Sequence, residues 1–145
     1  MSLLRRVVLD TSTLVGAALK PGSVPHRALL LALTRSDVCA SVQTWLELER
    51  VMQHRRFDRY LARGVRLEFA ALLRQSMQIF AVTPADEAAL QPPCRDAGDN
   101  KFLALVQVCQ ADVLVSSDDD LLVLNPWRGV PVLRPVEFLS YRQAL

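Results

Sequence analysis

Short apolar runs alternate along the chain with longer segments in which apolar and polar residues are mixed at helical spacing. Short apolar runs rich in β-branched residues are typical of buried strands, and the longer segments are typical of helices. The predicted strands are RRVVLD (5–10), SDVCA (36–40), QIFAV (78–82), DVLVS (112–116) and VPVLRP (130–135). The predicted helices are 25–35, 44–53, 66–77, 99–110 and 120–124, and VEFLSYRQAL (136–145) follows the last strand.

This alternation predicts an α/β fold, in which helices cover both faces of a central, mostly parallel sheet in a three-layer α/β/α arrangement. The 145 residues are enough for one domain with a sizeable core. We find no repeat or linker, and the two stretches richest in proline and glycine, KPGSVP and QPPCRDAGD, are typical of loops inside a domain. The sequence therefore predicts a single domain over residues 1–145.

Charge, apolar runs and cysteine spacing exclude further classes of protein. The formal net charge of +2 is too small to indicate a polyanion partner by itself. Of all residues, 51% are hydrophobic. No apolar run approaches the roughly 18 residues that span a bilayer, and Asp10 interrupts the apolar start where a signal peptide would continue. Cys39, Cys94 and Cys109 form no CxxC pair, which indicates buried thiols in a reducing compartment. We expect a cytoplasmic protein without a membrane segment.

Acidic side chains follow the predicted strands or begin the helices beside them. Because the carboxyl ends of parallel strands meet at one edge, where open sheets bind ligands, we expect these acids to lie close together. They are Asp10, Glu47, Glu49, Asp99, Asp118, Asp119 and Asp120. A cluster of at least four carboxylates raises their pKa values and costs stability unless a cation neutralises it. Oxygen ligands without nearby histidine or cysteine suit Mg²⁺ or Mn²⁺.

Helix capping is the alternative explanation for each acid taken alone. Aspartate is a favoured N-cap, and a carboxylate in the first turn stabilises a helix by roughly 0.3–1 kcal/mol. For Asp99, and for each of the three consecutive aspartates at 118–120, capping and metal binding are equally open. Asp10 is harder to explain by capping, because it ends a strand of otherwise apolar character.

Four segments, VVLDTSTLV, LELERVM, RDAGDNKFLAL and DVLVSSDDDLL, resemble in their order and spacing the PIN domain. The closing RGVPVLRPVEFL is similar to the end of bacterial PIN proteins that are toxins of toxin–antitoxin pairs. No single motif is specific, so the order of the four over nearly the whole chain carries the resemblance. It implies a metal-dependent endoribonuclease that uses Mg²⁺ or Mn²⁺, acts on RNA, binds an antitoxin protein and forms a homodimer.

The resemblance also implies roles for individual residues. The acids of the family's pocket correspond to Asp10, Glu47, Asp99 and Asp118, with Asp120 as a further metal ligand. Ser12 stands where the family usually has asparagine, and Ser117 stands where a small hydroxyl or glycine is usual; both are expected to support the ligands. Helix geometry alone leaves Glu47 and Glu49 equivalent, each about 100° from the apolar centre of the helix. The family pattern selects Glu47.

An arginine-rich segment, HRRFDRYLARGVR (54–66), interleaves its cations with Phe57 and Tyr60. Such a mixture can hold phosphates and stack a base. The residues expected to contact RNA are Lys101, Arg55, Arg56 and Arg59, with Arg63 and Arg66 in the same segment. A solvated helix face with tertiary ion pairs is the alternative, and the pattern alone slightly favours it.

Other functions are compatible with an aspartate after the first strand. A phosphoryl-accepting receiver or a dehalogenase-like hydrolase would need a lysine after a later strand, and VLVSSDDD has none. The dehalogenase-like pattern also needs a second acid where Ser12 stands. A PIN-like domain that is catalytically weak or inactive, and that acts as an RNA- or protein-binding module, is the second hypothesis. The full set of acids argues against it.

Overall fold

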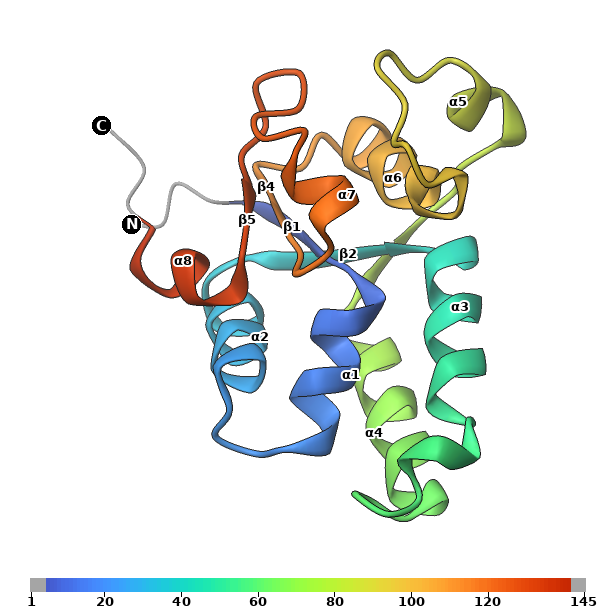
Figure 1. Ribbon diagram of the computed structural model, residues 1–145, viewed down its shortest axis with the longest axis vertical. Coiled ribbons are helices and arrows are strands. Elements are labelled where there is room, and N and C mark those ends of the chain that lie inside the picture. The colour runs from blue at the N-terminus through green and yellow to red at the C-terminus, as the bar shows by residue number, and fades with distance from the viewer. Residues whose placement is uncertain (1–4, 142–145) are drawn as a thin grey trace.

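The computed structural model describes residues 5–141 and is built on a five-stranded sheet whose strands all pair in parallel (Figure 1). The strand order is β3-β2-β1-β4-β5. The strands are β1 (Arg6–Leu9), β2 (Asp37–Ser41), β3 (Gln78–Phe80), β4 (Val113–Val115) and β5 (Val132–Leu133). The two ends of the predicted domain, residues 1–4 and 142–145, lie outside the described residues.

The central strands divide their side chains between two cores. Val7 and Leu9 pack into one core, and Val8 packs into the other. On the neighbouring strand, Val113 and Val115 join the first core in the same way. Side chains of a strand alternate between the faces of the sheet, so an apolar run such as VVL buries both faces. Helices must therefore cover the sheet on both sides.

The helices form two outer layers (Figure 1). One layer contains α1 (Thr11–Leu19), α2 (Val24–Arg35), α3 (Val42–Met52), α4 (Arg63–Ser76) and α8 (Pro135–Ser140). The other layer contains α5 (Pro84–Ala88), α6 (Asn100–Cys109) and α7 (Asp119–Leu122). Two 3₁₀ turns, Arg55–Phe57 and Ala97–Asp99, precede α4 and α6. The predicted α/β/α fold is thereby confirmed.

The sequence pattern did not predict three of the described helices, α1, α5 and α8. In α1, five of nine residues are buried, and its apolar residues cluster too closely to show a polar face. The five-residue α5 depends on a capping box, in which Thr83 and Asp86 exchange side-chain and backbone hydrogen bonds. The predicted last strand is also too long, because Pro135 already begins α8.

Arg66 is the largest side chain that is completely buried. Its guanidinium donates to the backbone carbonyls of Met52 at 2.8 Å, His54 at 3.2 Å and Leu61. It also forms an ion pair with Asp58 at 2.9 Å. Arg66 is therefore unavailable to RNA phosphates, and the alternative of a tertiary ion pair applies to this arginine.

The three cysteines are buried and free, as expected for structural thiols. Cys39 lies in β2, Cys109 ends α6, and Cys94 lies in the loop before the second 3₁₀ turn. Between residues 5 and 141, the structure contains no helix with the length and apolar character needed to cross a lipid bilayer.

Candidate functional site

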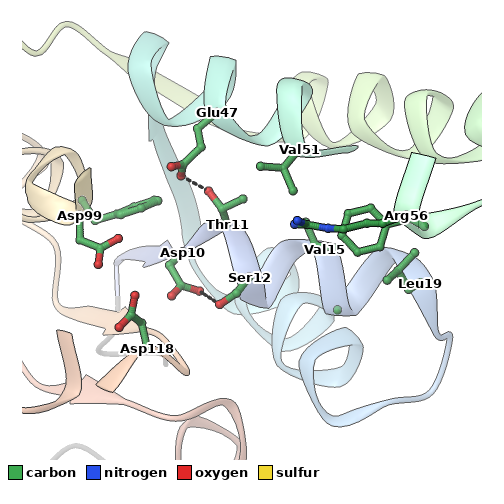
Figure 2. Close-up of a pocket in the computed structure, with 13 residues that line it drawn as sticks. Asp10, Thr11, Ser12, Val15, Leu19, Glu47, Val51, Arg56, Asp99 and Asp118 are labelled. Carbon is green, nitrogen blue, oxygen red and sulfur yellow. Dashed lines mark hydrogen bonds between the residues drawn. The ribbon is translucent and has the colours of Figure 1, made fainter. Parts of the chain in front are cut away.

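A cavity of about 460 Å³ opens at the carboxyl edge of the sheet (Figure 2). Of the seven acids expected at this edge, four line the cavity, the four that the family resemblance selects: Asp10, Glu47, Asp99 and Asp118. They come from four places in the chain, namely the end of β1, the middle of α3, the turn before α6 and the turn after β4. Only the parallel arrangement of the strands brings these places together.

Asp10 is almost completely buried, with 3% of its surface exposed, and three donors hold its carboxylate. One oxygen accepts hydrogen bonds from the Thr13 backbone N–H at 3.0 Å and from the Ser12 hydroxyl at 3.2 Å. The other oxygen accepts a hydrogen bond from the Ser116 hydroxyl at 2.6 Å. Asp10 thus caps α1, and it retains acceptor capacity, because a carboxylate can accept about four hydrogen bonds.

Ser12 contacts Asp10, in line with a supporting hydroxyl, and the second serine that contacts Asp10 is Ser116 and not Ser117. Ser117 is exposed, whereas Ser116 is completely buried and contacts Asp10. The cause is the strand register: Leu9 pairs with Val115, so the next residues, Asp10 and Ser116, lie side by side. If the pairing of β1 with β4 had been known, the sequence would have indicated Ser116 as the serine beside Asp10.

Glu47 is fixed from two sides. It accepts a hydrogen bond from the Thr11 hydroxyl (Figure 2). It also forms an ion pair with Lys101 at 2.9 Å. Both members of the ion pair are largely buried, with 22% of the Lys101 side chain and 19% of the Glu47 side chain exposed. Glu49, on the other border of the same helix face, does not line the cavity. Lys101, which was expected to contact RNA, instead neutralises one acid of the site.

Asp99 and Asp118 differ in what they do for the helices that follow them. Asp118 caps α7 by accepting a hydrogen bond from the Asp120 backbone N–H at 2.9 Å, and it also lines the cavity. Asp99 makes no side-chain capping bond to α6, and its buried Oδ2 has no hydrogen-bond partner within residues 5–141. Burial, and next the adjacent Asp118 carboxylate, together raise the pKa of Asp99 from 3.8 to about 7. Capping therefore explains Asp118 in part and leaves Asp99 unexplained.

Asp120 does not line the cavity, contrary to its expected place beside Asp118. Its carboxylate forms an ion pair with Arg95 at 2.8 Å. Asp96, Asp99 and Asp120 also place one oxygen each within 4.8 Å of one another, in a more exposed cluster. We consider the cavity the better cation site, because Arg95 already neutralises Asp120 and Asp96 is exposed.

The arginine-rich segment contributes one cation to the cavity. Arg56 lines its far end, where the wall is apolar. Arg55 and Arg59 are exposed and do not line it. Of the three arginines expected to contact RNA, only Arg56 therefore lines the cavity.

Comparison with known families identifies the architecture. The sequence profile described as PIN domain matches residues 6–120, which is most of the chain. The chain belongs to the PIN domain family. A search of curated proteins gave no match.

Solved structures share this PIN domain fold at low sequence identity. VapBC2 from Rickettsia felis, bound to a DNA fragment from its promoter, is 13% identical over 89% of this chain and 97% of that chain, with a TM-score of 0.60. PAE2754 from Pyrobaculum aerophilum is 11% identical over 94% and 91%, with a TM-score of 0.58. VapC20 from Mycobacterium tuberculosis, a Sarcin-Ricin loop cleaving toxin, is 15% identical over 79% and 92%, with a TM-score of 0.53. At these identities the similarity extends to the fold alone.

The donors of this PIN domain fit a divalent cation. The cavity offers only oxygen ligands from its acids, as Mg²⁺ and Mn²⁺ prefer. The unpartnered Oδ2 of Asp99 and the raised pKa of the same carboxyl indicate a group whose charge lacks a partner among residues 5–141. Asp10, Asp99 and Asp118 are the residues best placed to hold the ion, with Glu47 beside them.

Asp99→Asn should change how the stability of the metal-free PIN domain depends on pH. The folded protein holds the Asp99 proton up to about pH 7, whereas the ordinary pKa is 3.8. The folded state therefore binds this proton more tightly, so the penalty from Asp99 is absent below about pH 4 and grows until about pH 7. Melting curves in EDTA should show the variant gaining stability relative to wild type across this interval.

The same melting curves with saturating Mn²⁺ are the control. The cation should remove the advantage of the variant, because binding to the folded state alone stabilises the wild-type protein by mass action. A difference between the two proteins that does not vary with pH in EDTA would contradict a raised pKa for Asp99.

Proposed function

We propose that the protein is a metal-dependent endoribonuclease that hydrolyses RNA phosphodiester bonds and is the toxin of a toxin–antitoxin pair. The observation that carries the proposal is the convergence of Asp10, Asp99 and Asp118 on one cavity, with an unpartnered buried oxygen on Asp99. Membership of the PIN domain family supports it, as does the fold shared with VapC20, a Sarcin-Ricin loop cleaving toxin.

The residues of the cavity would have different roles in such a reaction. Asp10, Asp99 and Asp118 would hold a divalent cation, which would supply Lewis acidity and neutralise charge on the phosphodiester. Ser12 and Ser116 hold the Asp10 carboxylate in one orientation, which keeps a metal site aligned.

Glu47 and Asp99 contribute charge to the site in different ways. Glu47, fixed by Thr11 and Lys101, adds an acid whose charge is already balanced. Asp99 has a pKa of about 7, so it can hold a proton near neutral pH and release it when a cation binds.

The proposed partners follow from the toxin–antitoxin assignment. The fold shared with VapBC2, which was crystallised on a fragment of its promoter, supports a cognate antitoxin protein for this chain. The same proposal includes that the protein forms a homodimer and is located in the cytoplasm. Exposed apolar residues on α3 and α4, including Leu46 and Leu72, provide surface for protein contacts.

Purified protein should cleave labelled single-stranded RNA with Mg²⁺ or Mn²⁺ and should not cleave it in EDTA, because hydrolysis needs the cation that the carboxylates would hold. The measurement is the number of turnovers per protein on a gel. Undiminished cleavage in EDTA, or no cleavage with either metal, would contradict the proposal. The same preparation of the Asp10→Asn variant controls for a contaminating ribonuclease.

RNA binding without turnover is the second candidate function. The ion pair between Lys101 and Glu47 favours it, because one of the four acids is then neutralised by the protein itself. RNA binding in EDTA together with no cleavage in Mg²⁺ or Mn²⁺ would select this candidate.

A further inference from the structure

The cavity has two chemically different ends. The acids lie at one end, and the other end is formed by Val15, Leu19, Val51 and Phe57 together with Arg56. The acids come from the edge of the sheet, whereas the apolar end lies between α1, the end of α3 and the turn that follows α3. A substrate that binds the acids through a phosphate would therefore continue toward an apolar wall with a cation on it.

Arg56 is the cation of this apolar end. Figure 2 shows its side chain extending from the turn toward the carboxylates, with the nitrogen atoms foremost. The guanidinium carbon lies 4.7 Å from the centre of the Phe57 ring. In the described part of the chain, Arg56 forms no ion pair with a carboxylate, unlike Arg66, Arg95 and Lys101. Its charge is free to meet an anion in the cavity.

The buried Arg66 holds the turn that carries Arg56 and Phe57. Its guanidinium binds the backbone before the turn, at Met52 and His54, and after it, at Leu61. The ion pair with Asp58 adds a contact at the residue that directly follows the turn. This wall of the cavity is therefore preorganised, which lowers the entropic cost of binding a ligand against it.

We propose that the apolar end of the cavity binds the nucleotide of the RNA substrate next to the scissile phosphate. Arg56 pairs with the phosphate of that nucleotide, and its base packs against Val15, Leu19, Val51 and Phe57. Arg66 is a positioning residue that acts through the turn. This inference rests on the proposed ribonuclease function and assigns a subsite within it.

The chemistry of the wall determines what this subsite can distinguish. Valine, leucine and phenylalanine side chains offer no hydrogen bonds to the edges of a base, so they take any base by apolar contact and stacking. The whole cavity, about 460 Å³, falls within the range of roughly 300–1,000 Å³ found for small-ligand sites. Removal of the base at this position should weaken RNA binding, and exchange of one base for another should change it little.

The chain contains a matched control for this subsite. Arg59 lies over the ring of Tyr60 at 4.9 Å, in the same arrangement as Arg56 over Phe57. Arg59 and Tyr60 are exposed and lie outside the cavity. Variants of the two pairs therefore remove the same chemistry from the same segment, once inside the cavity and once outside it.

The first experiment measures RNA affinity in EDTA by fluorescence anisotropy, with a labelled single strand of about eight nucleotides. Arg56→Gln and Phe57→Leu should each weaken binding roughly tenfold, the scale of one stacked base or one charged phosphate contact. Arg59→Gln and Tyr60→Leu should each change it by less than about twofold. Melting curves confirm that all four variants are folded.

The second experiment measures cleavage with Mg²⁺ or Mn²⁺ on strands in which one nucleotide beside the scissile bond lacks its base. The wild-type rate should fall at one flanking position, and Phe57→Leu should be insensitive to that change.

Equal losses from both pairs of variants would overturn the subsite in favour of diffuse charge attraction. Unchanged binding and cleavage in the Arg56 and Phe57 variants would overturn it in favour of another occupant, such as a peptide of a protein partner. Absence of cleavage by wild type would refute the nuclease proposal, and the binding series in EDTA would still decide the subsite.

Discussion

Asp10→Asn is expected to lower the rate of RNA cleavage by at least about 100-fold, the scale of effect when the alignment of a metal site is lost. Asparagine keeps the size of the side chain and an oxygen that can accept the Thr13 N–H, so α1 remains capped. The substitution removes the negative charge and replaces one oxygen of the carboxylate with an amide nitrogen, which cannot bind a cation. Because Asp10 lies at the end of the central strand, no neighbouring acid can take its place.

The measurement is single-turnover cleavage with Mg²⁺ or Mn²⁺, with a melting curve for each protein. Asp119→Asn is the matched control: it removes one carboxylate from the exposed side of α7, outside the acidic cavity, and should leave the rate unchanged. A rate close to wild type in Asp10→Asn would exclude Asp10 from the site. Equal losses in both variants would assign the effect to net charge.

Arg66→Met is expected to lower the free energy of unfolding by roughly 2–5 kcal/mol. Methionine fills much of the arginine volume with apolar atoms, so packing changes little. The backbone carbonyls of Met52 and Leu61 lose a charged donor, and an unpaired buried acceptor costs about 1–3 kcal/mol. Asp58 loses less, because 57% of its side chain is exposed and water can take the place of the guanidinium.

Urea unfolding of the two proteins measures this difference. Arg63→Met is the control on the same helix, since Arg63 is exposed and its bond to Gln53 is long, at 3.4 Å. It should change the free energy of unfolding by less than about 0.5 kcal/mol. Similar losses in both variants would mean that Arg66 acts only through the charge or propensity of the helix.

The strands and the fold class could be predicted from the sequence because their signals are local. Runs such as VVL and VLV are apolar at every position, which is required only of strands covered on both faces. Once a parallel sheet is predicted, its carboxyl edge is known, and acids that follow the strands must approach one another. The resemblance to the PIN domain added the choice of Glu47 over Glu49, which helix geometry could not make.

Side chains near the site depended on pairings between distant segments, and here prediction from sequence was weaker. Ser116 and Ser117 are chemically identical, and only the register of β4 against β1 determines which one contacts Asp10. Lys101 is only two residues from Asp99 in sequence, yet it forms its ion pair with Glu47 on another helix.

The sequence by itself determined the alternation of strands and helices, the membership of a family and the presence of enough acids for a metal site. These properties follow from residue type and spacing along the chain. The tertiary structure alone decided that Asp118 enters the cavity while Asp120 pairs with Arg95, and that Arg66 is buried while Arg56 lines the cavity. Neighbours in an arginine-rich or aspartate-rich segment have the same intrinsic chemistry. Their surroundings differ only after folding, when burial and the nearest opposite charge give each side chain its own environment.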